Sequence, residues 1–393
     1  MALTEYVMMP GADYQAACDM LRSKTGKTDL IKSGDLATEI GDLCNGSSDR
    51  NPDSKPIRFY DPYGNVLYGY TRAEAQELTE LPPGPTLSGV TFDRWTHTLE
   101  EIKNTQYFAE VGPQYKLNGN PCTVLIVDVY AANRSFTFNA DLWSSDMKMT
   151  VSWGDGTSST TLTGSSSTRK RSASHTYTTA GRKIIAVIAS GTPGGLGLYQ
   201  SNYYYPPIGP GINMSYVAGS VTPDYSLRSI LIGTYNTSNY PVYVGTATHC
   251  VGLTFVSTYK QSSRSGSSAY KLCPALRAIA GETAHRSVSS GYFQRCANLR
   301  RVWVNGSIAA GTFAECDALQ EIIFGDGTIN EPNMNVNWAM LMTTETPPTI
   351  GATSPVWGDK PIYVPDSAVD AYKTAAGWSS AANCILPRSQ YPD

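Results

Sequence analysis

Apolar residues return at a nearly fixed distance along the C-terminal half of the chain. Leucines stand at 227, 253, 276, 299 and 319, so the steps between them are 26, 23, 23 and 20 residues. Four of them sit in phrases that begin with a cysteine: CVGLTFV at Cys250, CPALRAI at Cys273, CANLRRVWV at Cys296 and CDALQEIIF at Cys316. Each phrase predicts one short strand whose Leu and following Ile or Val point inward. No single unit buries that face alone, so we expect stacked coils over 220–345.

The N-terminal half follows other periods. Residues 1–46 carry apolar positions at helical spacing, interrupted at Gly26, and predict a helical segment that we assign to docking. The stretch IRFYDPYGNVLYGYT from Ile57 predicts a β-hairpin, and a short helix at 72–78 completes a small module over 55–118. Alternating strands over 119–190 predict a β-sandwich. The Gly/Pro/Tyr-rich stretch 191–219 is a linker or a long binding loop, and residues 346–393 are expected to form a capping strand and helix.

Composition agrees with a multidomain, mainly β protein. Charged residues make up only 16% of the chain, whereas Tyr (25) and Gly (35) are abundant. The net charge of −3 and the lack of a basic footprint argue against nucleic-acid binding. The longest apolar runs fall far below the roughly 18 residues that span a bilayer, and the N-terminus does not resemble a secretory signal. We therefore expect neither membrane insertion nor export by a signal peptide.

Residues with catalytic or metal-binding chemistry are scattered. The eight cysteines form no C-x-x-C pair and no cluster with histidine, so we expect buried thiols that fill the interior of the coils, and no metal or cofactor. The four histidines belong to no H-E-x-x-H pattern, and no G-x-S-x-G is present. Asp155 and His175 could suggest an acid–base pair, but a turn of a sandwich offers no cleft. We interpret them as structural and predict that the chain is not an enzyme.

Three parts of the chain resemble known families. VSWGDGTSS with SHTYTTAGRKIIAVIA, carried by Trp153, Gly154–Thr157 and His175–Tyr177, resembles the polycystic-kidney-disease-type immunoglobulin-like domain. GYFQRCANLRRVWV and GTFAECDALQEIIF are similar to leucine-rich repeats of the bacterial surface-antigen type. The N-terminal phrases KTGKTDLIKSGDLATEIGDL and RFYDPYGNVLYGYT resemble tail-associated proteins of phages that infect Gram-positive gut bacteria.

These resemblances imply a phage virion structural protein, assembled in the host cytoplasm, of the tail-fibre or receptor-binding type. Residues up to about Ile102 would dock to other tail or baseplate proteins, and the repeats would bind a bacterial surface glycan or protein. A homo-oligomer, such as a trimer, would raise avidity. A bacterial cell-surface adhesin is the alternative, and a glycan-cleaving enzyme is a third reading.

The candidate receptor contacts lie on the outward side of the repeat strands. On a strand of pattern L-x-x-I-x-V, the residues between the inward ones point out. This predicts an exposed row made of Phe255, Arg301, Trp303, Glu321 and Ile323. An outward Trp303 needs either a partner or a neighbouring module to cover it. Tyr203, Tyr204 and Tyr205 form a second candidate, as rigid contact area or as packing for the loop.

Overall fold

The computed structural model describes residues 54–142, 145, 148–165, 170–190, 197–199, 225–233, 239–240, 250–258, 270–281, 287–288, 290–330, 338–351 and 357–392. The chain divides into two compact units, Met1–Lys55 and Pro56–Asp393, and every element below belongs to the second. The predicted helical segment 1–46 lies outside the described residues. The predicted loop 191–219 lies outside them too, except for strand β12 (Gly197–Tyr199).

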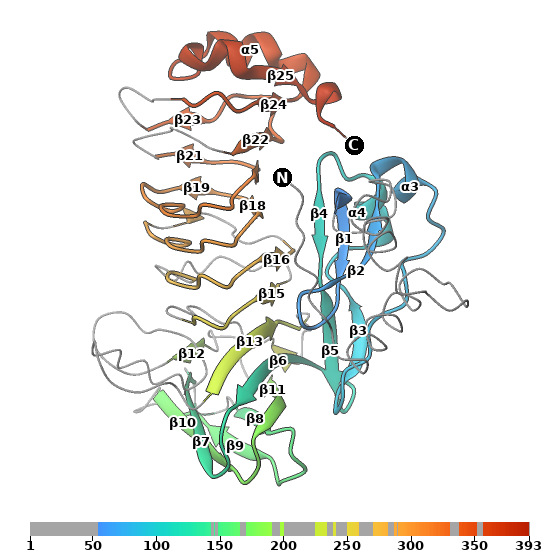
Figure 1. The fold of residues 1–393 in the computed structure, drawn as a ribbon, viewed down its shortest axis with the longest axis vertical. Coiled ribbons are helices and arrows are strands. Elements are labelled where there is room, and N and C mark those ends of the chain that lie inside the picture. The colour runs from blue at the N-terminus through green and yellow to red at the C-terminus, as the bar shows by residue number, and fades with distance from the viewer. Residues whose placement is uncertain are drawn as a thin grey trace, which may run out of the picture. The chain divides into compact units, whose positions relative to one another are not determined.

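A small module opens the second unit (blue in Figure 1). Strands β1 (Ile57–Tyr60) and β2 (Val66–Tyr70) form the hairpin that the sequence predicts. Helix α3 (Arg72–Gln76), strand β3 (Thr91–Trp95), helix α4 (Leu99–Lys103) and strand β4 (Ala109–Val111) follow. Capping boxes, Thr71 with Glu74 and Thr98 with Glu101, start both helices. Strand β4 pairs in parallel with β1, so the end of the module returns to its beginning.

Seven strands make up the next region. They are β5 (Pro113–Leu117), β6 (Asn120–Val129), β7 (Arg134–Asp141), β8 (Lys148–Ser152), β9 (Thr160–Thr163), β10 (Lys170–Tyr177) and β11 (Gly181–Ser190). One sheet has the order β6-β11-β8-β9, and the other has the order β10-β7-β12. Buried Phe136 and Trp153 belong to one core cluster, with ring centroids 6.4 Å apart. The two sheets therefore enclose a common interior.

The C-terminal part is a β-solenoid of about five turns. Strands β18 (Arg301–Val304), β20 (Glu321–Phe324), β22 (Ala339–Met342), β24 (Ile362–Val364) and β25 (Ile385–Pro387) pair in parallel in that order. A second parallel sheet contains β17 (Ser287–Val288), β19 (Ser307–Ile308), β21 (Thr328–Ile329) and β23 (Thr349–Ile350). Figure 1 shows these strands stacked one above another. The stacked coils predicted from the leucine spacing are present.

The sandwich region and the solenoid share one sheet. Strand β13 (Tyr225–Leu231) pairs antiparallel with β6, and on its other side in parallel with β15 (Phe255–Ser257), which pairs with β16 (Ala278–Ala280). Ser229 faces Phe255, and Phe255 faces Ala278, so the register steps are the same 26 and 23 residues as the leucine spacing. Backbone hydrogen bonds thus run without a break from the sandwich into the first coils, which makes this junction stiff.

The inside of each coil repeats the same contacts. The thiols of Cys296 and Cys316 donate to the carbonyls of Tyr270 and Phe293 in the preceding coil, each at 3.0 Å. Three residues before Cys273, Cys296 and Cys316 stands an aromatic ring. These rings stack: Phe293 on Phe313 with centroids 5.5 Å apart, and Tyr270 on Phe293 at 5.9 Å. The six cysteines in the described part of the chain are thiols, as expected. Burial raises the pKa of Cys316 to about 12, so that thiol stays protonated.

The C-terminal end closes the stack with aromatic side chains. Helix α5 (Val369–Thr374) is flanked by the 3₁₀ turns η2 (Asp366–Ala368), η3 (Ser379–Cys384) and η4 (Arg388–Gln390). Tyr372 and Trp378 are fully buried in the solenoid core, and Trp357 packs against it, as the sequence predicts for a cap. The sheet also extends beyond the predicted capping helix, because β25 follows the helix and pairs with β24.

We predict that Phe293→Ala destabilises the solenoid by about 3–5 kcal/mol, because the ring is fully buried between two stacked neighbours and its loss leaves a cavity. Urea unfolding followed by fluorescence would measure the loss. Leu67→Ala, at a side chain that is 40% exposed, is the control and should change stability by about 0.5 kcal/mol or less. Equal effects of the two changes would show that the ring stack does not hold the coils together.

Candidate functional site

The outward face of the solenoid sheet is covered. Phe255 and Ile323 are 0% and 3% exposed, so the prediction that they form an exposed row is wrong. The reason is the N-terminal module, which packs on this face: the ring of Tyr60 lies over that of Phe255, with centroids 5.2 Å apart. Trp303 is half-buried under the same module. Of the two readings of an outward Trp303, the structure favours cover by a neighbouring module.

Side chains of both parts form a separate apolar cluster at this contact. Tyr107, Phe108, Ile323, Leu341, Tyr363 and Tyr391 are its buried members. The hydroxyl of Tyr107 donates to the carbonyl of Met342 at 2.7 Å. The end of the chain takes part too, because Arg72 donates to the carbonyl of Tyr391 at 3.1 Å. The cluster joins residues that are more than 200 positions apart, a relation that a single sequence does not reveal.

A group of charged side chains lies in the same contact, here named the ionic clasp: buried Arg58 and Glu110 with half-buried Arg301 and Glu321. Arg301 lies 2.6 Å from Glu321 and 3.9 Å from Glu110, and Arg58 lies 3.8 Å from Glu110. Tyr60 donates a hydrogen bond to Glu110, and Tyr391 donates to Glu321 at 2.8 Å. Two cations and two carboxylates are thus matched within the contact. Arg301, expected to be exposed, instead pairs with Glu110 of the module, and Glu321 pairs with Arg301.

The backbones of the two parts also approach closely. The amide of Gly281 donates to the carbonyl of Glu110 at 2.8 Å, and the hydroxyl of Ser257 donates to the carbonyl of Pro113 at 3.1 Å. A Cβ on Gly112 would stand 2.2 Å from the Ser257 hydroxyl oxygen, so only glycine fits there.

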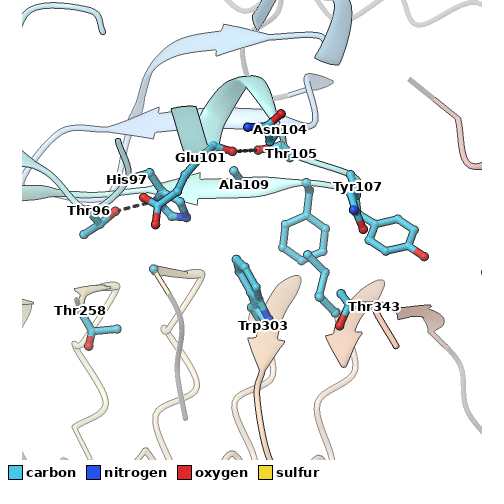
Figure 2. A pocket seen from close by; sticks show the side chains of 14 residues that line it. Thr96, His97, Glu101, Asn104, Thr105, Tyr107, Ala109, Thr258, Trp303 and Thr343 are labelled. Carbon is cyan, nitrogen blue, oxygen red and sulfur yellow. Dashed lines mark hydrogen bonds between the residues drawn. The ribbon is translucent and has the colours of Figure 1, made fainter. Parts of the chain in front are cut away.

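One stretch of the contact is left open as a cavity of about 370 Å³ (Figure 2). Nine module residues line one wall, and five solenoid residues line the other. The module residues are Thr96, His97, Glu101, Asn104, Thr105, Gln106, Tyr107, Phe108 and Ala109, and the solenoid residues are Thr258, Gly281, Trp303, Ile323 and Thr343. We call this space the cleft. Figure 2 shows His97, Glu101 and Asn104 above and Trp303 and Thr343 below. Its size falls within the roughly 300–1,000 Å³ of small-molecule sites.

The cleft is lined by one carboxylate, one histidine, and several hydroxyl, amide and aromatic groups. Its single carboxylate, Glu101, already accepts from the backbone amide of Thr98 at 2.8 Å and so caps helix α4. The Thr96 hydroxyl and the Nδ1 of His97 lie 3.1 Å apart. Glycoside hydrolysis by the usual route needs a pair of carboxyl groups, and the described lining holds one. Half-buried Trp303 offers a ring surface, and exposed Asn104 offers an amide at the rim. The amide oxygen of Gln106 already accepts a hydrogen bond from Arg388.

The remaining candidates from the sequence are placed as follows. Tyr203, Tyr204 and Tyr205 lie outside the described residues. His97, Glu101 and Asn104 were not predicted, because only the docking of the module brings them opposite the solenoid. The described ranges contain no group of three His, Cys, Asp or Glu that could hold a metal ion. Among those same ranges, no helix has the length and apolar character needed to cross a bilayer.

Asp155 and His175 have a structural role in the sandwich region. The Nε2 of His175 lies 2.6 Å from a carboxylate oxygen of Asp155, and its ring stacks on buried Trp153 at 5.1 Å. The Thr157 hydroxyl donates to the other carboxylate oxygen at 2.6 Å. Burial acts to raise the pKa of Asp155, but the hydrogen bonds from Thr157 and His175 outweigh it and lower the pKa to about 2. The contacts of Thr157 and His175 with the Asp155 carboxylate therefore fix the conformation of the Gly154–Thr157 turn.

We predict that Glu110→Gln loosens the module from the solenoid, because it leaves Arg58 and Arg301 buried without their shared carboxylate. Breaking a buried ion pair from one side costs about 3–5 kcal/mol. Hydrogen exchange should rise at the amide of Gly281, which bonds to the backbone of residue 110. Glu315→Gln is the matched control, since its pair with Arg295 is 55% exposed on both sides and should matter by about 1 kcal/mol or less. Unchanged exchange in Glu110→Gln would contradict the clasp.

We predict that Asp155→Asn lowers the stability of the sandwich region at neutral pH by about 1–2 kcal/mol and flattens its dependence on acid. The folded pKa of Asp155, about 2, lies below the usual value of about 3.9, so its stabilisation is present above pH 4 and is lost as the pH falls through 2. Thermal unfolding at pH 7, 4 and 2 measures the difference. Thr157→Val removes one donor and should flatten the profile less; identical profiles for wild type and Asp155→Asn would contradict this account.

Comparison with known proteins identifies no relative: no protein-family model, no curated protein and no solved structure matches the chain.

Proposed function

We propose that the chain is a phage virion structural protein of the tail-fibre or receptor-binding type. Its N-terminal region, up to about Ile102, would dock to other tail or baseplate proteins, and the C-terminal repeats would bind a glycan or protein on the bacterial surface. In this proposal the protein is not an enzyme, and it acts in the virion after assembly in the host cytoplasm.

The observation that carries the proposal is the way a cleft is built onto a stiff frame. The sheet from β9 to β16 is hydrogen-bonded throughout, and the module is held to the solenoid by the ionic clasp and the Tyr107 hydrogen bond. Such a frame fixes the two walls of the cleft before any ligand arrives, which lowers the entropy cost of binding. An attachment protein needs this combination of rigidity and an accessible recognition site.

The finer assignments of the fold belong to the same proposal. We infer a polycystic-kidney-disease-type immunoglobulin-like domain from Trp153, the Gly154–Thr157 turn and His175–Tyr177. The buried indole of Trp153 and the positive φ angles of Gly154 and Gly156, 74° and 83°, support it. We also infer that the coils are leucine-rich repeats of the bacterial surface-antigen type. The buried positions of Phe293, Cys296 and Leu299 support that assignment.

Immunogold electron microscopy would test the location, with antibody against residues 215–393 applied to a lysate and to intact cells of the source culture. We expect gold on the tails or fibres of particles. A sample of uninfected cells serves as the control and should stay unlabelled. Gold on the envelope of those cells would contradict the proposal and favour a bacterial adhesin.

A further inference from the structure

The cleft runs along the stacking direction of the solenoid. Its solenoid wall takes one residue from each of five successive coils: Thr258 after β15, Gly281 after β16, Trp303 in β18, Ile323 in β20 and Thr343 after β22. Neighbouring strands lie about 4.8 Å apart, so the wall extends over about 19 Å. A cavity of about 370 Å³ spread over that length is narrow and long. Its form suits a chain-like ligand better than a compact one.

Each wall of the cleft combines apolar and polar side chains. Trp303 and Ile323 face each other in register on neighbouring strands and give the solenoid wall an apolar strip. On the module wall, Tyr107, Phe108 and Ala109 add apolar surface, and the His97 ring, the Glu101 carboxylate and the Asn104 amide are polar. The Gln106 amide oxygen already accepts from Arg388, and the Thr105 hydroxyl donates to the carbonyl of Glu101. A sugar ring has the same two aspects, an apolar C–H face and a polar rim of hydroxyls. The Trp303 indole would stack on the C–H face of the sugar, and the amides and hydroxyls of the cleft would hydrogen-bond to the sugar hydroxyls.

The charged residues that line the cleft indicate which class of ligand it can bind. Among the described residues that line it there is no lysine or arginine, and its one carboxylate is Glu101. Acidic glycans and phosphorylated polymers are recognised by cationic side chains, above all arginine, so this lining disfavours them. An uncharged ligand with many hydroxyls meets no repulsion from Glu101 and finds both donors and acceptors.

We propose that the cleft between the module and the solenoid is a binding site for a neutral oligosaccharide, which lies across the coils with one ring stacked on Trp303. The inference rests on the proposed attachment function and gives its receptor a chemical class. It also moves the receptor site from the covered sheet face to the open stretch beside it.

Binding of the full chain to a printed panel of neutral, amino and acidic oligosaccharides tests the inference. Titration calorimetry follows, with the neutral oligosaccharide that binds best. We expect Trp303→Ala to weaken that binding by at least about 10-fold through loss of the stacked ring. Asn104→Ala, at an exposed rim position that packs in no core, should weaken it by about 3- to 10-fold. Tyr130 does not line the cleft and is 53% exposed, so Tyr130→Ala is the control and should bind as the wild type does.

The outcomes separate this inference from the proposed function. Loss of neutral-saccharide binding in both cleft variants, with melting temperatures of Asn104→Ala and wild type alike, supports the site. Equal binding by the variants and wild type places the site elsewhere and overturns the inference. A chain that binds only acidic saccharides, or none, overturns it as well. If the antibody against residues 215–393 still labels particle tails and the chain still adheres to host cells, the proposed attachment function stands without the saccharide. If neither is observed, the inference and the proposed function both fail.

Discussion

The contact between the N-terminal module and the outward face of the solenoid sheet determines most of what this molecule can do. A stack of coils buries its inward residues by itself, but Phe255, Ile323 and Leu341 on the other side of the strands are apolar and would face water. Covering them with Tyr60, Tyr107 and Phe108 removes that exposure. The chain end at Tyr391 is drawn into the same cluster, so the contact reaches from the first coils to the last strand.

This contact also explains where polar chemistry is found. Buried charges are tolerated there because Glu110 and Glu321 are matched by Arg58 and Arg301, and tyrosine hydroxyls bond the carboxylates. Where the two surfaces separate beside α4, the cleft opens. Its residues are held by the same elements that make the contact, since Tyr107 and Phe108 contribute both to the apolar cluster and to the lining. Recognition in this account is a property of two parts together and not of the repeats alone.

The sequence predicted the parts of the fold that depend on local spacing. Leucines 253, 276, 299 and 319 mark coils because each coil must bury the same inward face, and the register of the strands repeats their steps. Trp153, Tyr372 and Trp378 lie in cores, because large aromatic side chains next to strand patterns are seldom left in water. The hairpin at Ile57 followed from its turn residues.

The prediction of an exposed row was wrong because exposure depends on distant parts of the chain and not on local spacing. Strand alternation tells which side of a sheet Phe255 and Ile323 occupy, but it does not tell whether that side meets water. The residues that cover this side of the sheet lie about 150 to 240 positions earlier in the chain. The local pattern of the repeats does not predict their position. His97 and Glu101 were missed for the same reason. They lie between β3 and the end of α4, and only the folded chain places them opposite Trp303. The shared sheet between β6 and β13 was likewise hidden, because the intervening strands and the loop separate the two sequences.

Hydroxyl-radical footprinting of the full chain, read by mass spectrometry, tests the central claim most directly. The account predicts that Phe255 and Tyr107 resist oxidation in the native chain, while Tyr130, an exposed aromatic residue of similar reactivity, is labelled quickly. Trp303, half-buried in the cleft, should fall between the two groups. Labelling of Phe255 and Tyr107 at the rate of Tyr130 in the folded protein would contradict the account, because the solenoid face would then be open and no cleft would exist beside it.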